Sequence, residues 1–250
     1  MLCLHGFTDT WRTWELILPA LEQRHDVLAV TLAGHAGGPS IEGEVSHAAL
    51  ADSAERAMDE AGFETAHIVG NSLGGLVSLQ LAERHRARTV VALASAGGWA
   101  PGDHSAQDTL AYFATLQDLL RTAAPHADTI ASSPEGRRRA TEYMATNFEH
   151  IPADLIAHLI RGAARCEAAS DLIEFAGRAG WSLEAQKITC PVRIVSGTAD
   201  RILAWPMAAA RYREPWLPQA DWVQLDGVGH CPQLDVPLET EQLILGFTSE

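Results

Sequence analysis

Short apolar runs alternate with longer stretches of helical periodicity along most of the chain. Runs rich in Val, Ile and Leu predict buried strands, because strands that are covered on both faces are almost continuously apolar. Strands are expected at residues 2–4, 27–31, 66–69, 89–94, 192–195 and 222–225. Helices are expected between them at residues 11–23, 46–60, 73–84 and 239–247. This alternation predicts an α/β fold with a mostly parallel, doubly wound sheet.

The alternation is interrupted once, between residues 97 and 186. This stretch has no strand pattern, is rich in Ala, Arg and Glu, and is divided by Pro101, Pro125, Pro134 and Pro152. Because proline starts or breaks helices, several short helices are expected here. We therefore expect residues 1–96 and 187–250 to form an α/β core, and residues 97–186 to form a helical insertion packed on it.

Apolar residues inside this insertion recur at helical spacing, which is typical of positions that pack into a core. The positions concerned are Tyr112, Phe113, Leu116, Leu119, Met144, Phe148, Leu155 and Ile156. We expect them to join the insertion to the rest of the protein.

Composition narrows the classes of partner. Apolar residues make up 47% of the chain and charged residues 20%, which suits an ordinary folded domain rather than a disordered one. Thirty-two acidic and eighteen basic residues give a net charge of −14, so nucleic acid and anionic membrane surfaces are poor partners. No secretory signal is evident at the N-terminus, and the cytoplasm is the expected location.

Cysteine and histidine positions do not indicate a metal or a cofactor. Four cysteines lie far apart in the sequence and are expected to be reduced and mostly buried. Eleven histidines are scattered, and neither an H-E-x-x-H motif nor a zinc-ligand spacing occurs. We therefore expect neither a metal site nor a bound cofactor.

The clearest chemical signal is the segment Gly70-Asn71-Ser72-Leu73-Gly74-Gly75, which follows a predicted strand and begins a predicted helix. A serine at such a sharp turn needs very small neighbours, because larger side chains would collide there. Ser72 is therefore predicted to present its hydroxyl at the carboxyl edge of the sheet as a nucleophile. The Leu73 amide, at the start of the helix, is predicted to face a developing oxyanion.

A serine hydroxyl is a weak nucleophile, so it needs a base, and the base needs an acid that orients it. Asp200 and His230 each follow one of the last two predicted strands, in loops that contain glycine. Because the carboxyl ends of parallel strands meet at one edge of a sheet, Ser72, Asp200 and His230 are expected to converge. Asp226 and Asp235 are the alternatives for the acid.

A second oxyanion donor is expected from the loop after the first strand, which contains His5-Gly6-Phe7. Gly6 allows a close approach of the backbone, and the N–H group of Phe7 would then point at the oxyanion. The predicted oxyanion hole consists of the backbone amides of Phe7 and Leu73.

Together these segments resemble the α/β-hydrolase fold superfamily. The resemblance rests on His5-Gly6-Phe7, Gly34-His35, the segment 70–75, Gly197-Thr198-Ala199-Asp200 and Gly229-His230, which span nearly the whole chain. It implies Ser72 as nucleophile, His230 as general base and Asp200 as the orienting acid. It also implies that residues 97–186 form a variable cap over the serine, and that the reaction needs no cofactor.

Two features depart from the pattern of that superfamily. Its members usually have one to three strands before the His-Gly loop, whereas four residues precede His5 here, so these N-terminal strands are expected to be missing.

The second departure concerns the subfamily. The segment Gly-Asn-Ser-x-Gly-Gly is similar to the corresponding segment of carbon–carbon bond hydrolases of aromatic meta-cleavage pathways. Those enzymes have a Gly/Pro-rich oxyanion loop and often a Trp after the histidine, where this chain has Phe7-Thr8-Asp9 and Cys231. That subfamily is therefore less favoured.

Epoxide hydrolases and haloalkane dehalogenases of this superfamily use an aspartate nucleophile, because their first step alkylates a carboxylate. On this chemistry, Ser72 excludes both activities. The leading hypothesis is a serine hydrolase that cleaves a small-molecule carboxylic ester, lactone or thioester through an acyl-enzyme on Ser72.

The expected substrate is a largely apolar acyl compound. Candidate residues of the substrate pocket are Trp99, Phe113, Ile202 and Leu203. Three alternatives remain open: a carbon–carbon bond hydrolase, an acyltransferase or perhydrolase, and a weakly catalytic ligand receptor on the same fold.

Overall fold

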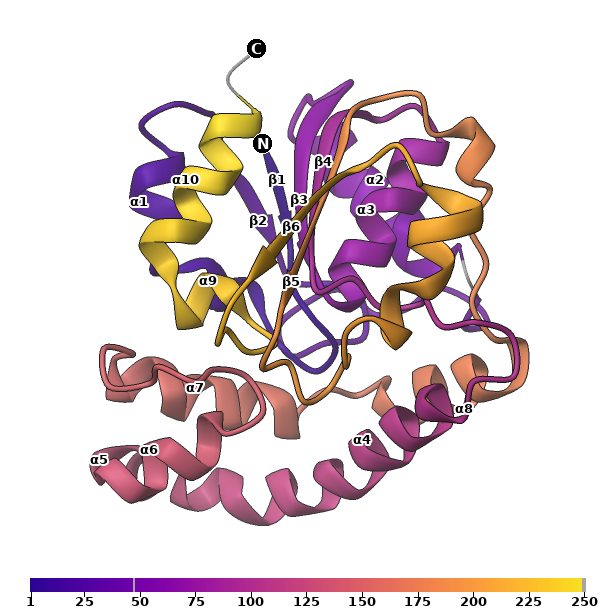
Figure 1. Cartoon of the computed structure of the whole chain (residues 1–250). Coiled ribbons are helices and arrows are strands. Elements are labelled where there is room, and N and C mark those ends of the chain that lie inside the picture. Colours follow the sequence, from indigo (N-terminus) through magenta and orange to yellow (C-terminus); the bar gives the residue numbers. More distant parts are fainter. Residues whose placement is uncertain (47, 249–250) are drawn as a thin grey trace.

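A six-stranded parallel sheet forms the centre of the protein, which is described by a computed structural model for residues 1–46 and 48–248 (Figure 1). Its order is β2-β1-β3-β4-β5-β6. The strands are β1 (Leu2–Leu4), β2 (Leu28–Val30), β3 (Ala66–Asn71), β4 (Ala87–Leu93), β5 (Val192–Gly197) and β6 (Asp221–Leu225). All six predicted strands are present within a few residues of their expected bounds, and the predicted α/β class is confirmed.

Helices cover both faces of this sheet. Figure 1 shows α1 (Leu18–Leu21) and α10 (Pro237–Phe247) on one face, and α2 (Ala49–Glu60) and α3 (Leu73–Glu83) on the other. The helices predicted at residues 73–84 and 239–247 are confirmed. The helix predicted at 46–60 begins at Ala49, and residue 47 lies outside the described part of the chain.

The single helix expected over residues 11–23 is wrong. The segment forms a 3₁₀ helix at Trp11–Trp14 and then the one-turn helix α1, which has a proline, Pro19, in its first turn. Proline has no N–H group, and its ring clashes with the preceding turn of a helix. A helix can therefore begin at Pro19 but cannot run through it.

Three further short elements lack a helical pattern in the sequence. They are a 3₁₀ helix at Met207–Ala209, a π-helix at Tyr212–Trp216 and the one-turn helix α9 (Pro232–Asp235). Segments of three to five residues are too short to show the periodicity of a helix face.

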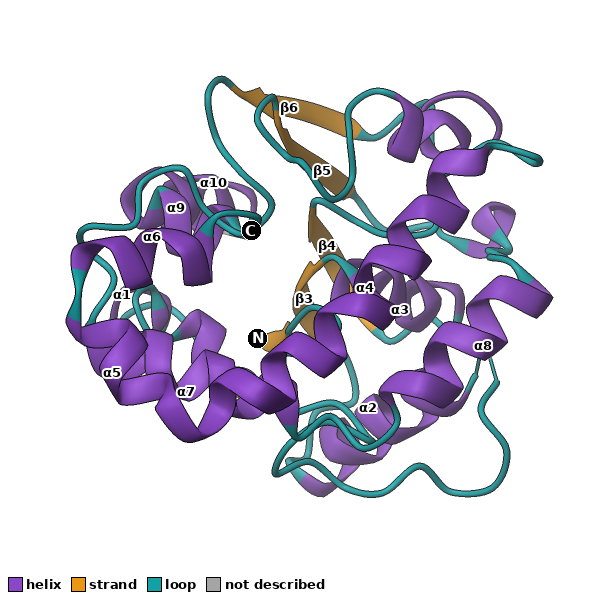
Figure 2. Cartoon of the chain, turned by 90° about the horizontal axis from the view of Figure 1, so that it is seen from below, coloured by secondary structure: helices purple, strands orange, loops and turns teal. Residues whose placement is uncertain are grey.

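The chain between β4 and β5 forms a layer of helices across the carboxyl ends of the strands (Figures 1 and 2). This layer, called the helical insertion below, comprises α4 (His104–Ala123), α5 (Ala127–Ser132), α6 (Pro134–Thr141), α7 (Ala153–Ala164) and α8 (Ala169–Ala179). The expectation that these helices are all short is wrong for α4, which has 20 residues. Pro101 and Pro125 lie on either side of α4, and no proline interrupts it.

Alternation along the short strand β1 divides the core into two halves. Leu2 and Leu4 pack in the cluster beneath α2 and α3, whereas Cys3 packs with Trp14 and Ile244 beneath α1 and α10. Successive strand residues point to opposite faces, so both faces of β1 are buried. Complete burial of one such Leu side chain contributes about 1.5–3 kcal/mol. This packing fixes the positions at which the strands end.

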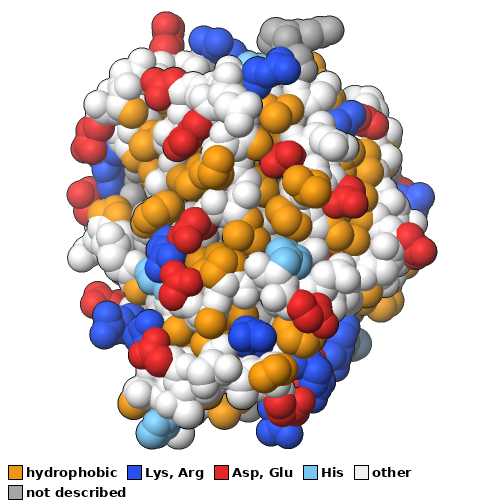
Figure 3. Space-filling view, turned by 90° about the vertical axis from the view of Figure 1, so that its left-hand side faces the viewer, with side chains coloured by type: hydrophobic (Ala, Val, Ile, Leu, Met, Phe, Trp, Pro, Cys, Tyr) orange, Lys and Arg blue, Asp and Glu red, His pale blue; other side chains and the backbone are white. Residues whose placement is uncertain are grey.

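Surface charges are intermixed on the face that carries α1 and α10. Figure 3 shows acidic, basic and apolar side chains side by side there, without a continuous patch of one sign. Among the described helices, none has both the length and the apolar character needed to cross a membrane. All four cysteines have free thiols, and Cys3, Cys166 and Cys231 are buried, as the sequence predicts.

Candidate active site

The sheet reverses its direction of winding between β1 and β3. Strand β1 lies between β2 and β3, so the loops that follow β1 and β3 leave the sheet next to each other at its carboxyl edge. In open α/β sheets this switch point opens a crevice for ligands. The loop after β1 contains Phe7, and Ser72 directly follows β3.

Ser72 lies on a strained turn between β3 and α3. Its φ of 54° and ψ of −114° are unfavourable for a residue with a side chain. A Cβ atom on Gly70 would overlap the carbonyl oxygen of Gly74, and a Cβ atom on Gly74 would overlap that of Leu4. The two glycines therefore allow the turn to fold tightly against β1, and the turn holds the serine at the edge of the sheet.

Asp200 and His230 form a buried pair. Nδ1 of His230 lies 2.8 Å from Oδ2 of Asp200, while Oδ1 of Asp200 accepts hydrogen bonds from the amides of Ile202 and Leu203, each at 2.8 Å. Because a carboxylate can only accept, Nδ1 carries a proton, and in the neutral ring the lone pair is on Nε2.

Two opposing effects act on the Asp200 carboxyl group. Burial raises its pKa, but His230 and the two loop amides favour the charged form more strongly, so the pKa stays below its ordinary value. Asp200 is therefore ionised at neutral pH and can stabilise positive charge on the imidazole ring.

Neither alternative acid contacts the imidazole ring. Asp226 accepts a hydrogen bond from the hydroxyl of Thr198 at 3.0 Å. Asp235 instead accepts hydrogen bonds from backbone amides, including those of Gly229 at 2.6 Å and Thr146 at 2.9 Å. Asp235 thus ties the loop before the histidine to the helical insertion.

Two backbone amides near Ser72 have no partner in the described chain. Leu73 is the first residue of α3, and the first N–H groups of a helix lack intrahelical acceptors. Phe7 lies in the turn after β1, and its N–H group also donates to no described protein group. Both amides are therefore free to donate to an oxygen atom bound beside Ser72.

A buried histidine fixes the loop that contains Phe7. His5 donates from Nδ1 to the carbonyl oxygen of Gly6 at 2.7 Å and accepts at Nε2 from the amide of Leu32 at 2.9 Å. Burial and the neighbouring His35 hold the pKa of His5 well below its usual value, so the ring is neutral and both bonds persist. His5 belongs to the His-Gly-Phe motif of the sequence, but its positioning role depends on the contact with Leu32 and cannot be seen in that motif.

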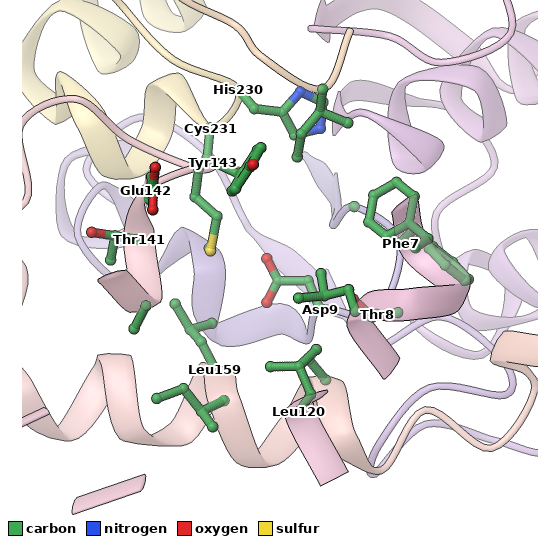
Figure 4. Close-up of a pocket in the computed structure, with 18 of the residues that line it drawn as sticks. Phe7, Thr8, Asp9, Leu120, Thr141, Glu142, Tyr143, Leu159, His230 and Cys231 are labelled. Atoms are coloured by element: carbon green, nitrogen blue, oxygen red, sulfur yellow. The ribbon is translucent and has the colours of Figure 1, made fainter. Parts of the chain in front are cut away.

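A cavity of about 710 Å³ separates the carboxyl edge of the sheet from the helical insertion. Its wall includes Ser72 and His230, so the serine and the imidazole ring border the same space. Figure 4 shows His230 at one end of this cavity, with Phe7 and Cys231 on its sides. The volume is in the range of pockets that bind small molecules.

A second and smaller cavity of about 70 Å³ also reaches Ser72. Phe113 lines both cavities, Ile202 lines the large one, and Trp99 and Leu203 line the small one. All four residues predicted from the sequence to face a ligand therefore border one of the two cavities.

The apolar positions of the helical insertion divide between core and cavity. Leu155 is buried in a hydrophobic cluster, as expected. However, Tyr112, Phe113 and Leu116 of α4 line the large cavity, and Leu119 is 64% exposed. Core packing therefore holds for Leu155 and not for Tyr112, Leu116 and Leu119, because helical periodicity marks an apolar face without showing whether side chains or an open space lie against it.

Asp9 is a cavity residue that the sequence analysis does not select. Its Oδ1 accepts a hydrogen bond from the amide of Thr10 at 2.7 Å. Burial raises the pKa of Asp9 to about 6, although the Thr10 amide, the Thr13 hydroxyl and nearby His230 lower it. The only sequence signal for Asp9 is its place in the loop after β1.

No metal site stands out in the part of the chain that the structure describes. Among these residues, no group of three or more His, Cys, Asp or Glu side chains is arranged to hold a metal ion. The polar groups at this edge of the sheet are the hydroxyl of Ser72, the imidazole ring of His230 and the backbone amides of Phe7 and Leu73.

Comparisons with known proteins agree with this architecture. Residues 1–243 match the sequence model described as Alpha/beta hydrolase family. Epoxide hydrolase EphH of Mycobacterium tuberculosis is 33% identical over 207 residues, which cover 82% of this chain and 96% of that protein. The Pimeloyl-(acyl-carrier protein) methyl ester esterase of Aromatoleum aromaticum is 24% identical over 255 residues, covering 98% and 96% of the two chains.

Solved structures show the same fold. The enol-lactonase from Burkholderia xenovorans superimposes with a TM-score of 0.71 and covers 100% of this chain and 90% of that one. Its sequence is 18% identical, so this likeness concerns the arrangement of helices and strands alone.

Proposed function

Because the chain belongs to the alpha/beta hydrolase family, we propose that it is a serine hydrolase that cleaves a small-molecule carboxylic ester, lactone or thioester. The observation that carries this proposal is that His230, whose ring is paired with Asp200, lines the same cavity as Ser72. A hydroxyl, a base and an orienting acid in this relation are the parts of acyl transfer through a covalent intermediate.

In the first half of the reaction, Ser72 Oγ attacks the carbonyl carbon of the substrate, and Nε2 of His230 accepts the hydroxyl proton. Asp200 stabilises the imidazolium ion that forms. The amides of Phe7 and Leu73 donate to the oxyanion of the tetrahedral intermediate. Collapse of this intermediate breaks the bond to the leaving group, which departs with the proton from His230.

In the second half, His230 removes a proton from a water molecule, which attacks the acyl carbon on Ser72. The same two amides hold the second oxyanion, and the serine leaves as it regains its proton from His230. The carboxylic acid product is released, and the enzyme returns to its starting state. Every proton is thus passed through one imidazole nitrogen.

A second candidate function comes from the relative named Epoxide hydrolase EphH. In this chain, attack of Ser72 on an epoxide would produce a serine ether, which has no carbonyl carbon for water to attack. The alkylated enzyme could not turn over by the route above, so we place ester cleavage first. Incubation with styrene oxide separates the two activities: diol formation supports the epoxide reaction, whereas stable alkylation of Ser72 contradicts it.

Other acceptors and bonds use the same serine and require product analysis. Hydroxylamine or an alcohol added to the assay would divert the acyl group of an acyltransferase away from water, and hydrogen peroxide would do so for a perhydrolase. A vinylogous 1,5-diketone would reveal carbon–carbon bond cleavage. A ligand receptor would bind without turnover, and Ser72→Ala would leave its affinity unchanged.

The proposal places the protein among small-molecule enzymes of the cytoplasm. Four free thiols suit a reducing compartment. A net charge of −14 opposes binding to nucleic acid and to anionic lipid, so the partner that we propose is a largely apolar acyl substrate.

Labelling with a fluorophosphonate tests this function without knowledge of the substrate. We expect one adduct, which peptide mass mapping assigns to Ser72, and no adduct in Ser72→Ala. Ser78→Ala is a matched control that should still be labelled, because Ser78 lies in the helix after Ser72 and donates its hydroxyl to the carbonyl oxygen of Gly74 at 2.7 Å. Labelling of folded protein at another residue, or none at all, would contradict the proposal.

A further inference from the structure

One carboxyl group in the large cavity has no part in the reaction described above. Asp9 follows Phe7 and Thr8 in the loop after β1 and lines the same cavity as Ser72. Figure 4 shows its carboxylate pointing into the open space, with Cys231 on one side and Leu120 and Leu159 on the other.

The Asp9 side chain lies deep inside the protein, but packed side chains do not surround it completely. Its side chain keeps some accessible surface, yet it lies far enough inside the protein for burial to raise its pKa. A side chain keeps accessible surface and is still deeply buried when it faces an internal cavity, rather than packed side chains or bulk water. The surface that Asp9 keeps is therefore surface that a ligand can cover.

Groups of the protein use only part of the hydrogen-bonding capacity of the Asp9 carboxylate. The Thr10 amide donates to Oδ1, and the Thr13 hydroxyl also bonds to the carboxylate. A carboxylate has about four acceptor positions, so two remain open. Within the described chain, Asp9 forms no ion pair with a Lys or Arg side chain.

The other charged residues of the cavity wall are already paired. Arg138 and Arg139 both bond to Glu135, at 2.9 and 2.7 Å. Glu142 pairs with Arg201 at 2.9 Å. These groups lie at the exposed rim, and among the described residues of the wall they leave Asp9 as the carboxylate without a Lys or Arg partner. A buried charge without a counter-ion is costly unless a bound cation or strong donor compensates it.

We propose that Asp9 is the specificity residue for a protonated amine in the substrate, which this carboxylate binds while Ser72 attacks the carbonyl group. The inference rests on the proposed serine hydrolase function and narrows its substrate class. The substrate is an ester, lactone or thioester whose hydrocarbon part lies against the apolar wall and ends in a basic nitrogen. The amine stays intact in the reaction, because Asp9 only binds and orients it.

Matched boronic acids test this assignment, since boron forms a reversible adduct with an activated serine. Phenylboronic acid with an aminomethyl group at the meta or para position carries a cation, and its ethyl counterpart has nearly the same shape. Inhibition constants are measured by competition with fluorophosphonate labelling of Ser72. In the wild-type protein we expect the better aminomethyl compound to bind at least about tenfold more tightly than its ethyl counterpart.

Substitution of Asp9 should remove this preference. In Asp9→Asn the ratio of the two inhibition constants is expected to fall to about one, because a neutral amide has no charge to pair with the ammonium group. Asp9→Ser serves as the second variant, since its hydroxyl can still accept the Thr10 amide and support the loop. Glu142→Gln is the matched control, because Glu142 is an exposed acid of the same cavity wall and should leave the ratio unchanged.

The outcomes separate this inference from the function on which it rests. Equal binding of both boronic acids to the wild-type protein overturns the role of Asp9 while Ser72 remains the nucleophile. An ammonium preference that survives in Asp9→Asn and fades in high salt also overturns it, because long-range attraction by the acidic protein explains that result. Failure of both boronic acids and the fluorophosphonate to react with Ser72 overturns the proposed function itself, and the inference with it.

Discussion

The side-chain amide of Asn71 donates a hydrogen bond to the backbone carbonyl oxygen of His230, and the two atoms are 3.0 Å apart. Asn71 also donates to the carbonyl oxygen of Leu93 at 3.2 Å, at the end of the neighbouring strand β4. The residue before the candidate nucleophile thus holds the backbone of the candidate base, although 159 positions separate them in the sequence.

Replacement of Asn71 by Ala should reduce both stability and turnover. Asn71 is 1% exposed, and its removal leaves the carbonyl oxygen of His230 without this donor, at a cost of about 1–3 kcal/mol in the free energy of unfolding. Because the His230 loop loses its anchor, kcat should fall more than KM rises. Urea unfolding and ester hydrolysis measure the two effects, and an unchanged kcat in a destabilised variant would limit Asn71 to a structural role.

The three proposed catalytic residues should behave as one unit. Ser72→Ala and His230→Ala are each expected to lower esterase kcat by several orders of magnitude, and the double variant should lose little more. Asp200→Asn should cost about 10³- to 10⁴-fold, because the amide favours the wrong imidazole tautomer. Steady-state kinetics on a chromogenic acyl ester measures these losses, and a retained rate would remove that residue from the mechanism.

Asp235 should matter mainly for stability, in contrast to the three proposed catalytic residues, which should matter mainly for turnover. Its carboxylate accepts amide hydrogen bonds from Gly229, Thr146 and Asn147, and it is 1% exposed. Asp235→Ala should therefore lower the free energy of unfolding by at least about 2 kcal/mol, because several buried donors lose their acceptor. Thermal and chemical unfolding test this expectation, and a fully stable Asp235→Ala protein would contradict it.

The glycine at position 74 should tolerate no side chain. Gly74→Ala places a methyl group against the carbonyl oxygens of Leu4 and His5, and we expect a loss of roughly 3 kcal/mol or more, or failure to fold. Gly246→Ala is the control, because this glycine lies in α10 with open space around its Cβ position. The control should gain about 0.5–1 kcal/mol from helix propensity.

Asp9 should make the stability of the protein depend on pH in a recognisable way. Its pKa is about 6 in the folded protein and near the ordinary value of 3.8 in the unfolded chain. Between these values the folded state binds more protons at Asp9, so this group lowers the free energy of unfolding as pH rises from about 4 to 6.

Asp9→Asn removes the free-energy cost of burying an ionised carboxylate at this position. At pH 7 the variant should be more stable than the wild-type protein by about 1–3 kcal/mol, and the difference should vanish below about pH 4. Urea titrations at a series of pH values measure it, with Glu142→Gln as the exposed control. A wild-type protein that is the more stable of the two at pH 7 would contradict the predicted cost of burying this carboxylate.

Local patterns in the sequence were sufficient to predict the strands of the sheet and the turn that carries Ser72. Six apolar runs correspond to β1 through β6. β1 and β3 are buried along their whole length, and strands of this kind need little information beyond continuous apolar character. The glycines at 70 and 74 mark the turn, since the contacts that exclude a side chain there lie within the turn or on the adjacent strand β1. Pro19 shows the limit of such patterns, because helical spacing concealed a helix break at residues 11–23.

The sequence by itself determined the order of the strands along the chain, the strained turn and the residue types that follow each strand, because these depend on neighbours within a few positions. Only the tertiary structure decided that Asp200, and neither Asp226 nor Asp235, contacts His230. It also decided that Asp9 faces a cavity. Both results depend on how distant segments pack around the carboxyl edge of the sheet, and burial and an empty space are properties of that packing rather than of any local pattern.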